Sequence, residues 1–333
     1  MINRSLSIRV LVVVLTVSAA MGNAAEPAAA AGAKDTVSLS INRASLKTLP
    51  TQMLVERLIA MGHQVKLVVI ANTSAEIRAG AANSVDITSA SMTAQLPAMD
   101  AGLDRKVFLS RYTNPFVLIA EKDIKGCDGL NGKTLTVATA TDISGVLARE
   151  WLAAKCPSVK PSIQSVPNGK DRLSALIQGA ANASVLDLED ATTAMHKAPG
   201  KYAILADLAK EYPIVGGAYS ALPKWLEEHK AFVHDFIAAD LDVQAAIYAN
   251  PAAFKERAKK LLSAEEPAVV SDAVDLYLAD KIFPADGDLA TDRVQQTIEF
   301  SAPAGGFKHV RGPDDVVDRR YLDAVLAARR KPK

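Results

Sequence analysis

Small hydroxyl, amide and charged side chains recur where short β-rich stretches of the sequence end. Hydroxyl and amide groups both donate and accept hydrogen bonds, and a helix N-terminus beside them adds free backbone N–H groups. Such a set is suited to binding a small polar or anionic organic molecule. The candidate ligand-binding residues are Arg43, Ser45, Asn72, Ser89, Ser91, Thr139, Thr141, Asn168, Asp187 and Tyr219.

Two members of this set carry a charge. Arg43 is its only cation, and we expect it to pair with an acidic group of the ligand, although a solvated surface arginine is the alternative. Asp187 could receive an amine or a hydroxyl, so the two together suit a polar, zwitterionic molecule. The acidic run at 187–190 (DLED) also fits a strand end followed by a helix start, where negative charge complements the helix dipole.

Motifs for catalysis or metal binding are weak. The triplet at 132–134 (GKT) resembles the end of a phosphate-binding loop, but Cys127 stands where the first glycine is required. The triplet also precedes a predicted strand, whereas a phosphate-binding loop follows one. The five histidines are scattered, and His229 and His234 do not share a helix face. We therefore expect no enzyme activity, no cofactor and no metal site.

The elements that position the polar set repeat twice along the chain. Predicted strands at 37–41, 65–71 and 85–89 are separated by helical patterns at 48–61 and 74–82. Strands at 133–138, 162–166 and 183–187 follow with similar spacing, again with helical patterns between them. Two βαβαβ units predict an α/β fold of two lobes with mostly parallel sheets and flanking helices. Ligands of open α/β sheets bind outside the carboxyl ends of the strands, so the polar set should face a cleft between the lobes.

Two irregular crossings and a helical end complete the predicted architecture. Asn114-Pro115 precedes an extended apolar run, and the segment 212–219 contains Pro213 and a glycine pair. After Pro223 the pattern is almost entirely helical. We predict that lobe one comprises 35–117 and 218–333, including the C-terminal helices, and that lobe two comprises 118–217.

The N-terminus predicts export. Arg4 and Arg9 precede an apolar run at 10–20, and Gly22 and Ala24 are small residues placed as in a cleavage site. The run is too short to span a bilayer, which takes about 20 residues. We expect a signal peptide at 1–24, cleaved near Ala24, and a flexible leader at 25–34. The mature protein should then be periplasmic.

The two cysteines fit an oxidising compartment. Cys127 lies just before the predicted strand at 133–138, and Cys156 follows the helix that returns beside that strand. A βα unit brings both to the same end of lobe two, so we expect a disulfide between them.

Composition excludes some partners. The chain has 333 residues, 49% of them hydrophobic and 23% charged, with a formal net charge of +1. This balance is ordinary for a soluble protein and gives no reason to expect binding to nucleic acid or an anionic membrane surface. We expect a monomer.

The order of several loose motifs resembles a known family, the substrate-binding proteins of ABC importers for alkanesulfonates, taurine, nitrate and thiamine-type pyrimidines. These motifs are LSINRASLKTLPTQMLVERLIAMGH at 39–63, VDI at 85–87, NPF at 114–116 with VLIA at 117–120, LNGKTL at 130–135, ALIQG at 175–179 and DRRYL at 318–322. The family often has glycine before the aspartate of the first helix–strand element, where this chain has Asn83 and Ser84.

The resemblance implies the type II periplasmic binding fold, a small-molecule ligand held between two lobes, and a partner permease in the inner membrane. Some enzymes of thiamine-pyrimidine and menaquinone synthesis are similar in fold. The thiamine-pyrimidine synthases depend on a cysteine-rich motif that this chain lacks, and the predicted signal peptide argues against both enzyme classes. A periplasmic sensor or receptor subunit is a further alternative.

Overall fold

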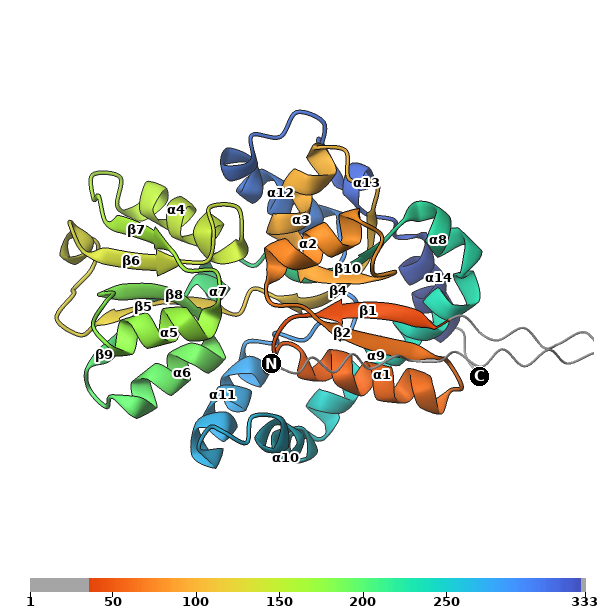
Figure 1. Cartoon of the computed structure of the whole chain (residues 1–333), viewed down its shortest axis with the longest axis horizontal. Helices are drawn as coiled ribbons and strands as arrows, with labels where there is room; N and C mark the ends of the chain where they lie inside the picture. Colours follow the sequence, from red (N-terminus) through yellow and green to blue (C-terminus); the bar gives the residue numbers. More distant parts are fainter. Residues whose placement is uncertain (1–35, 331–333) are drawn as a thin grey trace, which may run out of the picture. The chain divides into compact units, whose positions relative to one another are not determined.

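The structure, a computed structural model, describes residues 36–330. The predicted signal peptide at 1–24 and the predicted leader at 25–34 lie outside the described residues. Strands and helices alternate up to residue 221, except that two strands follow each other directly at 106–113 and 116–121, and helices follow after residue 221 (Figure 1). None of the described helices is both long enough and apolar enough to cross a membrane.

Five strands form two sheets in the part of the chain that we call lobe one. They are β1 (Val37–Ile41), β2 (Val65–Val69), β3 (Thr88–Ser91), β4 (Lys106–Thr113) and β10 (Val215–Ala221). β1 and β2 are parallel, and Ile87 adds a parallel bridge to Leu39, whereas β3, β10 and β4 form an antiparallel sheet in that order. The helices between these strands are α1 (Leu49–Ala60), α2 (Thr73–Ala81) and α3 (Met92–Asp100).

The other five strands form one sheet, in what we call lobe two. They are β5 (Phe116–Glu121), β6 (Thr134–Val137), β7 (Ser162–Ser165), β8 (Ala183–Asp187) and β9 (Tyr202–Ala206). In the order β7-β6-β8-β5-β9, the first three are parallel and β5 is antiparallel to both of its neighbours. Its helical segments are η1 (Asp128–Leu130), α4 (Ile143–Lys155), α5 (Gly169–Ile177), α6 (Leu188–Lys197) and α7 (Leu208–Glu211).

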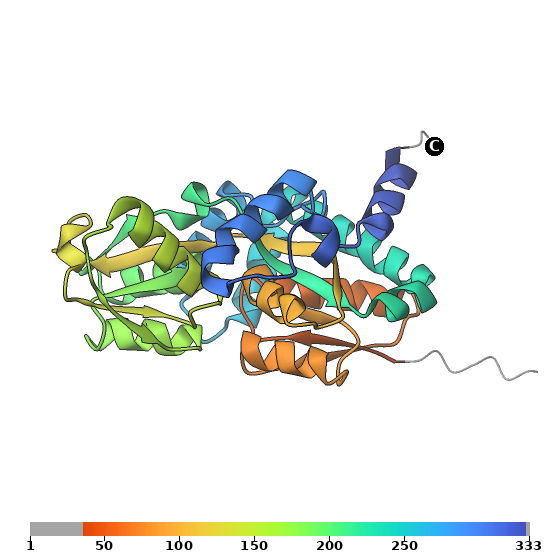
Figure 2. The same cartoon turned by 90° about the horizontal axis from the view of Figure 1, so that it is seen from above.

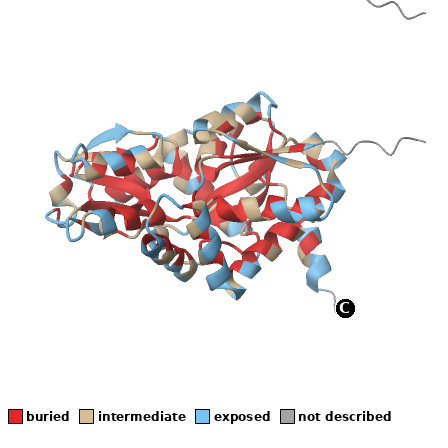
Figure 3. Cartoon of the chain, turned by 60° about the horizontal axis from the view of Figure 1, so that its bottom comes forward, coloured by how far each residue is buried: buried red, intermediate tan, exposed pale blue. Residues whose placement is uncertain are grey.

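Alternating side chains of β5 show how this sheet is covered. Leu118 and Ala120 pack in the same apolar cluster as α4, whereas Val117 and Ile119 pack with α5 and α6. Successive strand residues point to opposite faces, so an apolar run predicts burial on both sides. Figure 3 shows the buried residues running along the strands of both lobes.

In the described part of the chain after β10, which ends at residue 330, there are seven helices. They are α8 (Pro223–Glu228), α9 (Lys230–Ala249), α10 (Pro251–Leu261), α11 (Pro267–Ala279), α12 (Thr291–Gly305), α13 (Pro313–Val316) and α14 (Arg320–Arg330). α9 packs against α1 and α14, but α11 packs against α6 of lobe two, and α12 contacts both α3 and α4 (Figures 1 and 2). The C-terminal helices therefore connect the two lobes as well as covering lobe one.

The α/β fold with two βαβαβ units and a helical C-terminal region is confirmed. The expectation of mostly parallel sheets needs correction in lobe one, because β3 pairs antiparallel with β10 and, of its described strands, only β1 and β2 form a parallel pair. One local expectation needs correction, because the strand predicted at 85–89 begins only at Thr88. Asn72 caps α2 by accepting a hydrogen bond from the Ala75 amide at 3.0 Å. Asn83, in the turn between α2 and β3, has φ of 51°, in the left-handed region that asparagine adopts more readily than most residues. The lobe boundaries at 117/118 and 217/218 stay a prediction.

Candidate functional site

Loops from both lobes line one cavity of about 80 Å³, enough for several water molecules. They follow β1, β2 and β3 in lobe one and β6, β7 and β8 in lobe two, with two aromatic residues beside the crossing from β4 to β5. The lining residues are Asn42, Arg43, Ser45, Lys47, Ala71, Asn72, Thr73, Ser91, Tyr112, Phe116, Ala138, Asp142, Ile143, Pro167, Asn168, Gly169, Arg172 and Asp187. The cavity lies at the carboxyl ends of strands, as the topology predicts.

Six of the ten candidate residues from the sequence meet at this cavity. They are Arg43, Ser45, Asn72, Ser91, Asn168 and Asp187. The other four, Ser89, Thr139, Thr141 and Tyr219, do not line it.

Three of these four residues have identified surroundings, and Thr141 is half-buried in the loop before α4. Tyr219 is 1% exposed within the core, where its hydroxyl lies 2.8 Å from the hydroxyl of Thr51. Ser89 is fully buried two residues before the end of β3. Thr139 serves the turn into α4, because its hydroxyl accepts a hydrogen bond from the Asp142 amide at 3.2 Å. A position after a strand therefore does not by itself place a side chain in the cavity.

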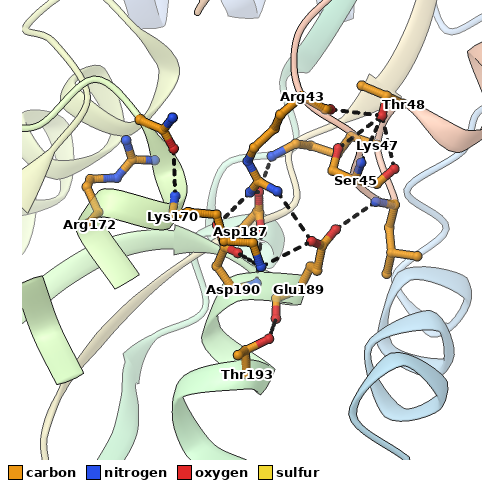
Figure 4. A network of polar contacts seen from close by, with 12 residues as sticks. Arg43, Ser45, Lys47, Thr48, Lys170, Arg172, Asp187, Glu189, Asp190 and Thr193 are labelled. Carbon is orange, nitrogen blue, oxygen red and sulfur yellow. Dashed lines mark hydrogen bonds and ion pairs between the residues drawn. The ribbon is translucent and has the colours of Figure 1, made fainter. Parts of the chain in front are cut away.

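Arg43 is held by carboxylates of lobe two (Figure 4). Its Nη2 lies 2.7 Å from Asp190 Oδ2 and 3.9 Å from Asp187 Oδ2, and its Nη1 lies 3.4 Å from Glu189 Oε1. The three carboxylate side chains are at most 3% exposed, and that of Arg43 is 25% exposed. The cation predicted to bind the ligand thus already has partners in the protein.

Further contacts join the same two segments. Lys47 forms an ion pair with Asp187, and the backbone amide of Leu46 donates to Glu189 Oε2 at 2.6 Å. Lys170 of α5 lies 3.0 Å from Asp190 Oδ1. We call the contacts of the loop 42–48 with the start of α6 the loop–helix clasp. The clasp links lobe one to lobe two beside the cavity.

The clasp changes the proton affinities of its members. Burial lowers the pKa of Arg43, but the attraction of the three carboxylates outweighs it and holds that pKa above its ordinary value. Burial acts to raise the pKa of Asp187, but Lys47 and Arg43 hold it well below its usual range. Burial, with Asp187 and Asp190 adding like charge, raises the pKa of Glu189 to about 7.

Other lining groups have no partner among the described residues. Nδ2 of Asn72 and Nδ2 of Asn168 are free because each side chain uses its oxygen to cap a helix, α2 and α5 respectively. The Ser91 hydroxyl is buried and makes no hydrogen bond. The carboxylate of Asp142 and Nη2 of Arg172 are also without a partner in the described chain. The cavity therefore offers both donors and acceptors to a small molecule.

Lys47, Tyr112, Phe116 and Arg172 are among the lining residues that lie outside the ten candidates. Lys47 lies in the loop after β1, and the pattern placed it in the approach to a helix. Tyr112 and Phe116 belong to crossing strands, whose apolar composition predicts core. Arg172 lies inside α5, where an arginine is expected to face solvent, yet it is 5% exposed. Only the position of Lys47, near Arg43 in the same loop, could have signalled a role.

The cysteines lie apart from the cavity lining. Cys127 and Cys156 form a disulfide in lobe two, with Cα atoms 5.4 Å apart. Between residues 36 and 330, no group of three or more histidine, cysteine, aspartate or glutamate side chains is arranged to hold a metal ion.

The sequence of the chain matches a known protein family. The model of the "NMT1/THI5 like" family matches residues 60–254. No curated protein matches the chain.

Several solved structures are similar in fold. A ligand-binding component of an ABC-type import system from Staphylococcus aureus, with zinc bound, has a TM-score of 0.72 at 11% identity, covering 87% of this chain and 98% of its own. The periplasmic aliphatic sulphonate-binding protein SsuA from Escherichia coli has a TM-score of 0.66 at 16% identity, covering 85% and 92%. A Candida albicans protein with the generic periplasmic binding protein fold has 0.64 at 14%, covering 88% and 95%.

Proposed function

The chain belongs to the NMT1/THI5-like family, and from this we propose that it is a solute-binding protein that captures a small polar organic molecule and delivers it to an ABC importer. The observation that carries the proposal is the cavity, which is lined by the loops after three strands of each lobe. Its free hydroxyl, amide and charged groups can replace the water around a polar solute, which favours binding there.

The comparisons support a transport role. The similar proteins from Staphylococcus aureus and Escherichia coli are described as components of import systems or as periplasmic binding proteins. With the predicted signal peptide, this supports a periplasmic location and a permease of the inner membrane as partner. A monomer is sufficient, because both lobes that line the cavity come from one chain.

The family match also fits the enzyme alternative, since this family is linked to thiamine biosynthesis. The synthases of this fold depend on a cysteine-rich motif, whereas the two cysteines of this chain form a disulfide and neither lines the cavity. The sensor alternative would use the same cavity and differs only in the partner that recognises the loaded protein.

The direct test is to identify a solute that copurifies with protein produced in the native host. Denaturing the protein should release a small polar molecule in a near-stoichiometric amount, detected by mass spectrometry. Calorimetry with that molecule and the emptied protein should then show one binding site. Release of no solute, together with no binding of any polar solute tested, would contradict the proposal.

A matched pair of variants locates the site. Ser91 lines the cavity with an unpartnered hydroxyl, whereas Ser89 on the same strand is buried but does not line it. Ser91→Ala should weaken binding of the copurified solute about tenfold, as expected for loss of one buried hydrogen bond of about 1.4 kcal/mol. Ser89→Ala should leave the affinity unchanged. Equal effects of the two substitutions would place the solute elsewhere.

A further inference from the structure

The charged groups of the loop–helix clasp are not free to bind a solute. Arg43 is paired with Asp190 and Glu189, and Lys47 is paired with Asp187 (Figure 4). A ligand that took these partners would have to break buried ion pairs, and breaking a buried pair is strongly unfavourable. The charges that recognise the ligand must therefore be sought among the remaining lining residues.

Arg172 is a buried cation with one free edge. Its Nε donates to the Val185 carbonyl at 3.2 Å, and its Nη1 donates to the carbonyls of Val166 at 2.9 Å and Pro167 at 3.3 Å. These bonds fix the guanidinium plane, while Nη2 has no partner among residues 36–330 and the residue lines the cavity. A fixed guanidinium with a free N–H edge is a specific site for an anionic group.

Asp142 is the opposite charge in the same cavity. It is the N-cap residue of α4, yet its side chain makes no capping bond and its carboxylate has no hydrogen-bond donor in the described chain. It is only 9% exposed. A nearly buried carboxylate needs a donor or a cation, and no residue between 36 and 330 donates a hydrogen bond to it or pairs with it.

Arg172 and Asp142 interact electrostatically but form no ion pair. Burial lowers the pKa of Arg172, and Asp142 is the carboxylate that opposes this most strongly. No ion pair within 4.0 Å joins the two side chains, although both line the cavity. The space between them can thus hold the two ends of one small molecule.

We propose that the ligand is a small dipolar molecule, whose anionic group pairs with Arg172 and whose ammonium or other N–H donor group pairs with Asp142. The proposal rests on the solute-binding function and names its ligand class. The free amides of Asn72 and Asn168 and the Ser91 hydroxyl would complete the hydrogen bonds of the anionic end. A simple anion would satisfy Arg172 but leave Asp142 unpaired, so the cavity disfavours it.

The test uses matched probes on the emptied full-length mature protein. The panel contains ω-amino carboxylates and ω-amino sulfonates of two to four carbon atoms, each with the corresponding acid lacking the amine and the amine lacking the acid. Binding is measured by thermal shift at millimolar concentration and then by calorimetry. At least one dipolar compound should bind tenfold or more tightly than both of its singly charged counterparts.

Variants of the two charged residues separate the two ends of the ligand. Asp142→Asn should remove the preference for the dipolar probe over its amine-free acid, and Arg172→Gln should weaken binding of both at least tenfold. The controls are Asp171→Asn and Arg149→Gln, which change similar side chains on α5 and α4 that do not line the cavity. Both controls should bind the probes as the wild type does.

Several results would overturn this ligand class while leaving the solute-binding function intact. One is a copurified solute that binds but does not carry both charges. Another is a singly charged probe that binds as tightly as its dipolar counterpart, or an Asp142→Asn variant with unchanged selectivity. If the dipolar probes do not bind but another solute does, the ligand class is wrong. If no solute binds the wild-type protein, the proposed function itself fails.

Discussion

Removing Arg43 should loosen the contact between the lobes rather than abolish a ligand contact. In Arg43→Ala, Asp190 loses a partner at 2.7 Å and Glu189 loses one at 3.4 Å. Glu189 keeps the Leu46 amide, and Asp190 keeps Lys170 at 3.0 Å. Each of the two carboxylates therefore loses one partner but keeps another.

The expected change in the free energy of unfolding follows from these remaining partners. Breaking a fully buried pair costs about 3–5 kcal/mol, whereas an exposed pair contributes about 0–1 kcal/mol. With Arg43 25% exposed and with other cations remaining, we expect a loss of about 2 kcal/mol in the free energy of unfolding. The melting temperature should fall by about 4–8 °C on the scaling for domains of this size class.

Arg57→Ala is the matched control. Arg57 pairs with Asp242 on the surface, and both side chains are at least 40% exposed, so its loss should cost less than about 1 kcal/mol. Urea unfolding of both variants measures the difference.

Hydrogen exchange reports on the clasp itself. The Leu46 amide donates across the clasp to Glu189, so its exchange should become faster in Arg43→Ala and stay unchanged in Arg57→Ala. Equal unfolding free energies for the two variants, or an unchanged exchange rate at Leu46, would refute the reasoning.

Three further predictions concern parts of the fold that support the site. Burial raises the pKa of Asp240 to about 7, so the native state keeps a proton that the unfolded chain has lost, and this group's contribution to stability falls as pH rises from about 4 to 7. In urea unfolding at a series of pH values, the free energy of unfolding should fall less steeply with pH in Asp240→Asn than in the wild type. Asp242→Asn, which changes an exposed carboxyl of the same helix, should show the wild-type dependence. A Cβ at Gly145 would lie 1.9 Å from the Thr139 carbonyl oxygen, so Gly145→Ala should distort the start of α4 and lower the melting temperature, while Gly312→Ala, with 3.8 Å to its nearest neighbour, should not. Removing the disulfide by serine substitution should cost about 3 kcal/mol, measured by urea unfolding, and free-thiol titration of unreduced wild-type protein should find no thiols.

Much of the fold follows from the sequence because its signals are local. Alternating or continuous apolar runs predict strands, and each predicted strand start lies within a few residues of an observed one. Asn83 is an example at the level of one residue: an asparagine between a helix and a strand predicts the left-handed conformation, and φ is 51°.

The sequence by itself also determined where a ligand site should lie, because residues after the strands of a βαβαβ unit must gather at one edge of its sheet. Only the tertiary structure decided which side chains are free there. Arg43 and Asp190 are separated by 147 residues in the chain, and their pairing depends on how the two lobes pack. Arg172 could not be assigned from its helical surroundings, because its burial depends on backbone carbonyls outside α5 and on the opposing lobe. Local pattern determines conformation, whereas the pairing of charges depends on neighbours distant in sequence. The sequence could therefore predict polar residues at the strand ends, but not which of their charges are already paired within the protein.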